Sequence, residues 1–267
     1  MVKTLYLILV GAVIITGCGC VKYIENKFTF YPGKRIEFYP SVFNLDFEDV
    51  YVKTEDGIRI NGWFIPQSNA KYTLLFFHGN GGNIGTRLKK LLMLRNTSIN
   101  IFIIDYRGFG KSEGKGSEKG LYLDAKAAYD YLIDSRGIQP EQIILYGESL
   151  GAAVAIDLAC NAKVKAIILE GVFSRGRDMA SKICPFLPKS LFSNSYDSLK
   201  KIKKVQVAKL FIHSRNDEIV PFALANKLYN ASPEPKELVE INGSHNTAFL
   251  DSQEKYISSI GLFIEKL

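Results

Sequence analysis

The chain has 267 residues, of which 47% are hydrophobic and 23% are charged, and no segment is repetitive or of low complexity. This balance is typical of one globular domain with a sizeable core, and it excludes a disordered or fibrous protein. The net charge of +7 comes from lysines spread along the chain. Because the densest group, 200–204, lacks interleaved aromatic residues, we expect no nucleic-acid partner.

The first twenty residues contain an apolar run, 5–15, behind a single basic residue, Lys3. The run is shorter than the roughly 20 residues that span a bilayer, and its length is typical of a signal peptide. It ends in Ile15-Thr16-Gly17-Cys18, which resembles a bacterial lipobox. We therefore expect residues 1–20 to carry a signal peptide with lipidated Cys18, so that acyl chains hold the chain on a membrane. The alternative is an uncleaved membrane anchor.

Either alternative predicts a membrane-associated protein, and a lipoprotein would hold its folded domain outside the cytoplasm. Residues 21–44 are expected to be a connecting segment, and 45–267 the folded domain. Short β-type runs separated by amphipathic stretches indicate an α/β domain with a mostly parallel sheet. The expected strands lie at 49–53, 58–65, 73–77, 101–105, 143–146, 166–169, 209–212 and 237–241.

Helical spacing of apolar residues appears at 84–95, 121–132 and 256–263, and after residue 151. The turn sequence at 54–57 predicts an antiparallel hairpin at one edge of the sheet. Residues 174–205 are too long for a simple crossover between two strands and contain two prolines. We expect this segment to form a small cap over the sheet.

The motif that bears most directly on chemistry is Gly147-Glu148-Ser149-Leu150-Gly151, between an expected strand and an expected helix. A G-x-S-x-G sequence there is typical of a tight turn that leaves no room for a Cβ and projects its serine. The helix that follows favours negative charge at its N-terminus. Ser149 is therefore the candidate nucleophile.

A serine hydroxyl needs a base, and the chain has three histidines. His245 lies in a turn after the last expected strand and is the candidate base, whereas His78 and His213 are expected to be structural. The acid that orients the base is expected to be Asp217, which follows the expected strand 209–212 and gives the chain order serine, acid, histidine known from hydrolases with a G-x-S-x-G turn. Its neighbour Glu218 is the alternative, followed by Asp197 and Glu170.

An oxyanion needs two N–H donors. We assign these to the backbone of Leu150 and of Asn80, which lies in the glycine-rich sequence 78–83 after a strand. The sequence 105–112 is also glycine-rich, but it lacks the spacing of a P-loop or a dinucleotide fingerprint. We expect it to be a structural loop that supports the site.

Five motifs, HGNGGN, DYRGFGKSEG, GESLG, HSRNDEIVP and GSHN, together resemble the α/β-hydrolase superfamily over residues 45–267. More narrowly they are similar to its small-capped branch of serine-aminopeptidase-like hydrolases and depalmitoylating thioesterases. The resemblance implies an eight-stranded α/β-hydrolase fold with helices on both faces. By position it makes Ser149 the nucleophile, Asp217 the acid and His245 the base. Ser214 departs from the family, in which a glycine usually follows the strand-end histidine.

These observations predict a membrane-tethered serine hydrolase that cleaves a carboxylic ester or thioester through an acyl-enzyme. The expected partner is a small ester or an acylated substrate. No metal or organic cofactor is expected, because the histidines do not cluster with acids or cysteines at ligand spacing. The alternatives are a serine aminopeptidase, which would need an acidic pocket for a free amine, and a non-catalytic binding module on the same scaffold.

Overall fold

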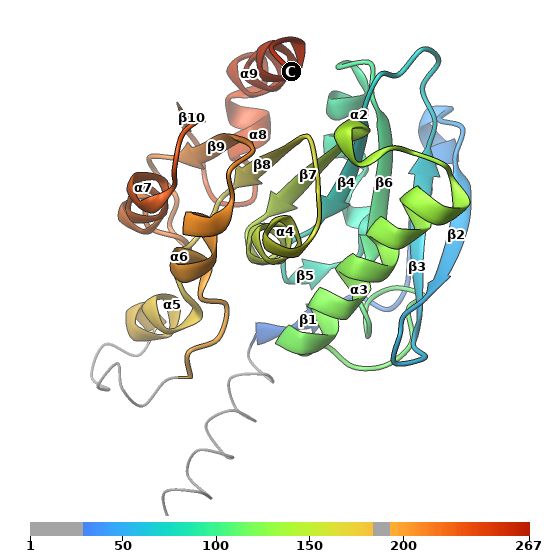
Figure 1. The fold of residues 1–267 in the computed structure, drawn as a ribbon, viewed down its shortest axis with the longest axis horizontal. Coiled ribbons are helices and arrows are strands. Elements are labelled where there is room, and N and C mark those ends of the chain that lie inside the picture. The colour runs from blue at the N-terminus through green and yellow to red at the C-terminus, as the bar shows by residue number, and fades with distance from the viewer. Residues whose placement is uncertain (1–28, 184–192) are drawn as a thin grey trace, which may run out of the picture.

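A computed structural model describes residues 29–183 and 193–267 of the chain (Figure 1). The lipidation predicted at Cys18 lies outside these residues and stays a prediction. Within the two described ranges no helix is both long enough and apolar enough to cross a bilayer.

An eight-stranded sheet forms the centre of the molecule, in the order β10-β9-β8-β7-β4-β6-β3-β2. β2 pairs antiparallel with β3, and β3 pairs antiparallel with β6, whereas the other neighbours are parallel. The strands are β2 (Glu48–Lys53), β3 (Arg59–Ile65), β4 (Thr73–Phe77), β6 (Asn100–Asp105), β7 (Ile143–Glu148), β8 (Ala166–Glu170), β9 (Ala208–Ser214) and β10 (Lys236–Ile241). The sequence prediction of a mostly parallel eight-stranded sheet is therefore confirmed, and each predicted strand is present within two residues of its expected bounds.

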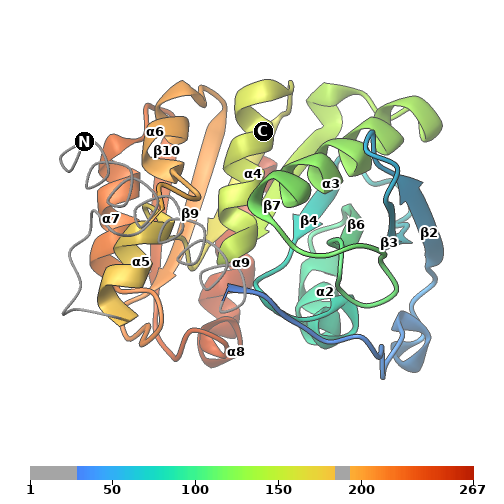
Figure 2. The ribbon, with the colours of Figure 1, turned by 90° about the horizontal axis from the view of Figure 1, so that it is seen from below.

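Helices cover both faces of the sheet (Figure 2). One face packs against α3 (Glu118–Asp130), α4 (Leu150–Asn161) and α7 (Phe222–Ala231), and the other against α2 (Leu88–Arg95) and α9 (Gln253–Glu265). Each face forms its own apolar core, because the central strands are buried on both sides. Shorter elements complete the fold: η1 (Pro40–Phe43), η2 (Ile84–Arg87), the π-helical η3 (Tyr131–Ser135), η4 (Pro140–Gln142), α5 (Gly176–Ile183), α6 (Ser198–Lys201), η6 (Ile202–Lys204) and α8 (Ala248–Asp251).

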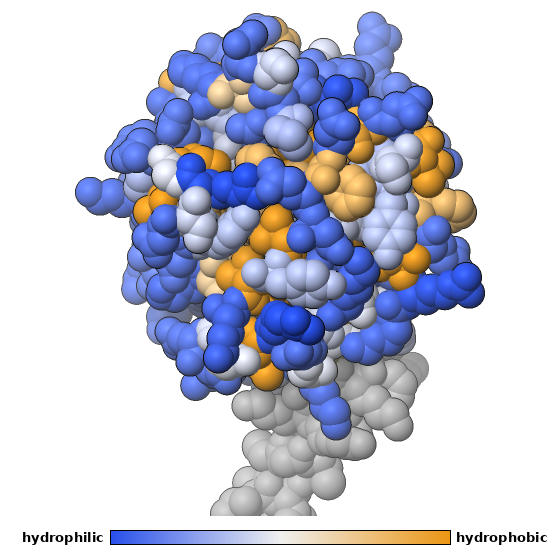
Figure 3. All heavy atoms as spheres, turned by 90° about the vertical axis from the view of Figure 1, so that its right-hand side faces the viewer, coloured by the Kyte–Doolittle hydropathy of each residue, from blue (hydrophilic) through white to orange (hydrophobic). Residues whose placement is uncertain are grey.

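The outer strand β2 is protected from edge-to-edge pairing by its charges. Glu48, Asp49 and Lys53 are exposed on this strand, whereas Val50 and Val52 point into the core. On the side of the molecule that carries β2, hydrophilic residues surround small hydrophobic patches (Figure 3). Charged residues on an edge strand discourage the addition of another strand.

The described part of the segment before β2, from residue 29 on, contacts the folded domain. Residues 21–44 are predicted as a connecting segment, but β1 (Tyr31–Pro32) pairs in parallel with β5 (Gly81–Gly82), about fifty residues further on. From β1 the chain crosses one end of the large sheet before it reaches β2 (Figure 2). The predicted cap, 174–205, contains α5, α6 and η6 in its described parts.

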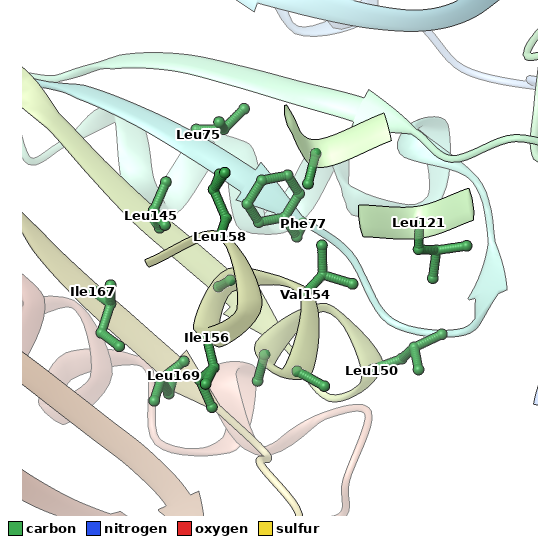
Figure 4. Close-up of a cluster of buried hydrophobic side chains, with 14 of the residues drawn as sticks. Leu75, Phe77, Leu121, Leu145, Leu150, Val154, Ile156, Leu158, Ile167 and Leu169 are labelled. Atoms are coloured by element: carbon green, nitrogen blue, oxygen red, sulfur yellow. The ribbon is translucent and has the colours of Figure 1, made fainter. Parts of the chain in front are cut away.

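Helix α4 lies unusually close to the strands beneath it. Apolar residues of α4, among them Val154, Ile156 and Leu158, pack on the side chains of β4, β7 and β8 (Figure 4). At the start of the helix, a Cβ on Gly151 would lie 1.9 Å from the carbonyl oxygen of Phe77 at the end of β4. Because that neighbour is backbone, only glycine allows this contact.

We expect Gly151→Ala to lower the free energy of unfolding by at least about 2 kcal/mol, because the helix must move off the sheet. The matched control is Gly261→Ala in α9, where a Cβ would meet nothing within 4 Å. That change should be neutral or stabilise by up to about 1 kcal/mol. Urea unfolding of both variants measures the difference, and equal stabilities would contradict the proposed backbone constraint.

Candidate active site

Ser149 occupies a sharp turn between β7 and α4. Its backbone has φ 53° and ψ −112°, a conformation that residues other than glycine rarely adopt. The turn is held by a hydrogen bond from the Ser149 N–H to the carbonyl of Glu170, 2.8 Å, and by one from Ala152 N–H to the Ser149 carbonyl, 3.0 Å. Strain of this kind persists only where the surroundings enforce it, and it marks the turn as a candidate site.

Three side chains from three loops form a continuous chain of hydrogen bonds. The Ser149 Oγ lies 3.1 Å from Nε2 of His245, and Nδ1 of His245 lies 2.7 Å from Oδ2 of Asp217. The second carboxylate oxygen of Asp217 accepts the backbone N–H groups of Ile219, 3.0 Å, and Val220, 2.7 Å. Asp217 is therefore fixed by backbone donors and presents its other oxygen to the imidazole. With Nδ1–H donated to Asp217, Nε2 can accept the hydroxyl proton of Ser149.

Asp217 and His245 shift each other's pKa through their hydrogen bond and their opposite charges. Burial, the largest effect, favours neutral His245, but the hydrogen bond and charge of Asp217 outweigh it and raise the pKa of His245 above its ordinary value, with help from Glu148 and Glu170. Burial also acts to raise the pKa of Asp217, yet the hydrogen bond and charge of His245 lower that pKa below its ordinary value. Asp217 is thus a stable carboxylate next to an imidazole that holds protons more tightly than usual.

The alternative acids have other partners. Glu218 accepts the backbone N–H of His245, 3.0 Å, and does not bind its ring. Glu170 is 2.7 Å from the Lys90 ammonium, and Asp197 caps α6 and pairs with Arg175. The structure therefore places Asp217, not the other three, against the imidazole.

The other two histidines are buried and held by backbone oxygens. His78 Nδ1 lies 2.7 Å from the carbonyl of Gly79, and His213 Nε2 lies 2.9 Å from the carbonyl of Val220. Burial lowers the pKa of His213. Only His245 contacts Ser149. In the parts of the chain that the structure describes, no group of three or more His, Cys, Asp or Glu residues could hold a metal ion.

Of the two predicted oxyanion donors, Leu150 directly follows Ser149 in the chain, and Asn80 directly follows Gly79, which lies close to Ser149. Leu150 is the first residue of α4, whose N-terminal N–H groups have no side-chain cap. On the other side, a Cβ on Gly79 would lie 3.6 Å from the Cβ of Ser149, so the loop that carries Asn80 packs against the turn. The sequence 105–112 supports this loop as predicted: the Tyr106 hydroxyl donates to the carbonyl of His78, 3.0 Å.

A buried ion cluster beneath Ser149 was not anticipated from the sequence. The Lys90 ammonium from α2 lies 2.9 Å from Glu148 and 2.7 Å from Glu170, and the hydroxyls of Tyr146 and Tyr256 also contact Glu170. Burial acts against the charge of Glu148, but Arg87 and Lys90 lower the pKa of this acid to about 2. The cluster could have been predicted from the strand register, since Glu148 and Glu170 end neighbouring strands and lie side by side. Two adjacent carboxylates, one of them buried, require a cation.

The sequence of this chain is similar to those of known proteins. The sequence model of the family described as "Serine aminopeptidase, S33" matches residues 68–199. The alpha/beta hydrolase domain-containing protein WAV2 of Arabidopsis thaliana is 32% identical, over 96% of this chain and 92% of that protein. Protein bem46 of Schizosaccharomyces pombe is 37% identical, over 68% and 64% respectively.

Solved structures share the fold at lower identity. An esterase of Pyrococcus furiosus superimposes with a TM-score of 0.73 at 22% identity, over 89% of this chain and 97% of that one. An alpha-beta hydrolase of Vibrio vulnificus superimposes with a TM-score of 0.71 at 21% identity, over 90% and 92%. Both TM-scores indicate the same overall fold as this chain.

The ion cluster around Lys90 should stabilise the folded state. We expect Lys90→Met to lower the free energy of unfolding by about 3–5 kcal/mol, because it leaves the buried carboxylate of Glu170 without its cation, whereas Glu148 keeps its pairing with Arg87. Lys89→Met is the matched control, since Lys89 is exposed on the same helix and should change stability by less than about 0.5 kcal/mol. Denaturant unfolding of the pair measures this, and a Lys90 variant as stable as the control would refute the role of the cluster.

Proposed function

The chain belongs to the α/β-hydrolase superfamily, and we propose that it is a serine hydrolase that cleaves a carboxylic ester or thioester through an acyl-enzyme on Ser149. The observation that carries this proposal is the unbroken hydrogen-bond chain Ser149–His245–Asp217 at a strained turn. A serine hydroxyl becomes an effective nucleophile when a base of suitable orientation accepts its proton. Asp217 supplies the orientation because it binds Nδ1 of the imidazole.

The reaction would proceed in two matched halves. Ser149 Oγ attacks the substrate carbonyl while His245 Nε2 takes its proton, and the carbonyl oxygen becomes an oxyanion. The N–H groups of Leu150 and Asn80 bind that oxyanion, a contribution of about 3 kcal/mol for each well-placed donor. The bond to the leaving group breaks as His245 returns the proton to it. Water then attacks the acyl-enzyme in the same way and releases the acid and free Ser149.

An ester or thioester fits the site better than a peptide with a free amino terminus. An aminopeptidase needs an unpaired carboxylate to bind the substrate ammonium. Three carboxylates around the site have partners of their own: Glu148 binds Arg87 and Lys90, Glu170 binds Lys90, and Glu218 accepts the His245 N–H. The apolar N-terminus and Cys18 motif favour a substrate with an acyl chain at a membrane. The aminopeptidase name of the matching family keeps that activity as the second candidate.

We expect steady-state hydrolysis of p-nitrophenyl esters and of an acyl thioester, with much slower cleavage of aminoacyl p-nitroanilides. Ser149→Ala should lower kcat by at least about 10⁴-fold. Because neutral His245 is the base and its pKa is raised, kcat/KM should fall as pH decreases through a value above the ordinary 6.5. Asp217→Asn removes the charge that raises this pKa, so its residual activity should fall off at a lower pH.

The control for the acid is Asp197→Asn, which keeps a side chain able to cap α6 and should retain full activity with an unchanged pH profile. Preference for the anilide over the esters would support the aminopeptidase. A folded wild-type protein with no activity on any of these substrates would support a non-catalytic binding module. An acid limb that stays in place in Asp217→Asn would refute the role of Asp217.

A further inference from the structure

The segment 29–33, termed the strap below, lies along the loop that carries Asn80. The Tyr31 N–H donates to the carbonyl of Asn80, 2.9 Å, and the Gly33 N–H donates to the carbonyl of Gly82, 2.7 Å. The side-chain amide of Asn80 donates in return to the carbonyl of Thr29, 2.9 Å. Both the main chain and the side chain of Asn80 are therefore bonded to the strap.

The strap is itself anchored at both ends. The ring of Phe30 stacks edge-on against Phe109, with ring centroids 6.4 Å apart. At the other end, the carbonyl of Gly33 accepts the N–H of Gly110, 3.0 Å, and the side-chain amide of Asn83, 3.1 Å. The strap thus joins the loop at 78–83 to the loop at 105–112. Its bonds hold the Asn80 carbonyl, in the peptide that follows this residue, and the Asn80 side chain, so they limit rotation of residue 80 and thereby of the N–H in the peptide that precedes it.

The Asn80 loop needs such support because of its composition. Glycines at 79, 81 and 82 surround Asn80, and glycine backbone reaches more conformations than any other. Gly81 has no atom within 4 Å of a Cβ position, and Gly82 has φ +74°. A peptide unit next to such residues can turn its N–H away from the site at low cost. An oxyanion donor is effective only when it is aimed beforehand.

We propose that the strap positions the Asn80 N–H for the oxyanion through the backbone of Thr29 and Tyr31. This inference rests on the proposed function, which assigns the oxyanion to Leu150 and Asn80. The strap residues are positioning residues and do not touch the substrate. The alternation of the ladder agrees with this role: Tyr31 and Gly33 donate to the loop, and Pro32, which has no N–H, lies between them.

The test is a pair of substitutions at one exposed position. Tyr31→Pro removes the N–H that binds Asn80, whereas Tyr31→Ala keeps this N–H and removes only a side chain that is 57% exposed. We expect Tyr31→Pro to lower kcat about tenfold or more with KM changed less than twofold, because a misaimed donor fails mainly in the transition state. Tyr31→Ala should stay within twofold of wild type. The inhibition constant of a trifluoromethyl ketone, which forms an oxyanion on Ser149, should rise in parallel with the loss in kcat/KM.

A second variant keeps the test decisive if Tyr31→Pro does not fold. Asn80→Ala retains the backbone N–H and loses only the bond to Thr29, so it should also lower kcat and weaken the ketone without changing KM. Wild-type hydrolysis that depends on Ser149, together with Tyr31→Pro or Asn80→Ala at wild-type kcat, would overturn the strap inference alone. Absence of Ser149-dependent hydrolysis in the wild type would overturn the proposed function instead.

Discussion

The close approach of α4 to the ends of β4 and β7 is the constraint on which the site depends. A Cβ on Gly151 would fall 1.9 Å from the Phe77 carbonyl oxygen, and one on Gly147 would fall 2.4 Å from Cα of Ala152. With so little room the chain reverses within one residue, which forces Ser149 into its positive φ. The same contact brings the end of β4, and with it the Asn80 loop, against the serine. Nucleophile and oxyanion loop thus share one geometric cause.

The ion cluster of Lys90, Glu148 and Glu170 beneath the turn is linked electrostatically to the His245–Asp217 pair. Lys90 pairs with both Glu148 and Glu170 at the ends of β7 and β8. These two acids, together with Asp217, raise the pKa of His245. The lysine is therefore structural in its contacts, whereas the acids that it stabilises influence the proton affinity of the base. A buried ion cluster in this place tunes the site without touching a substrate.

Much of this architecture follows from local sequence patterns, and the remainder depends on distant contacts. Apolar β-branched runs predicted all eight strands of the large sheet, and the turn at Ser149 followed from two glycines and its position between a strand and a helix. Asp217 and Glu218 are neighbours, so only geometry separates the residue that binds the imidazole ring from the one that binds the backbone of His245. The strap could not be predicted, because only two of its residues pair, with a loop fifty positions away, and so short a strand leaves no periodic pattern in the sequence. The buried position of Lys90 could not be predicted either, because α2 carries several cationic residues and its sequence does not distinguish the buried one from the exposed ones.

Covalent labelling shows whether Ser149 is an activated nucleophile. Folded wild-type protein is treated with a fluorophosphonate, and the adduct is located by intact-mass and peptide mass spectrometry. We expect one adduct per chain, on Ser149, and none in Ser149→Ala under the same conditions. No adduct on the folded wild type, or an adduct of equal yield in Ser149→Ala, would contradict it.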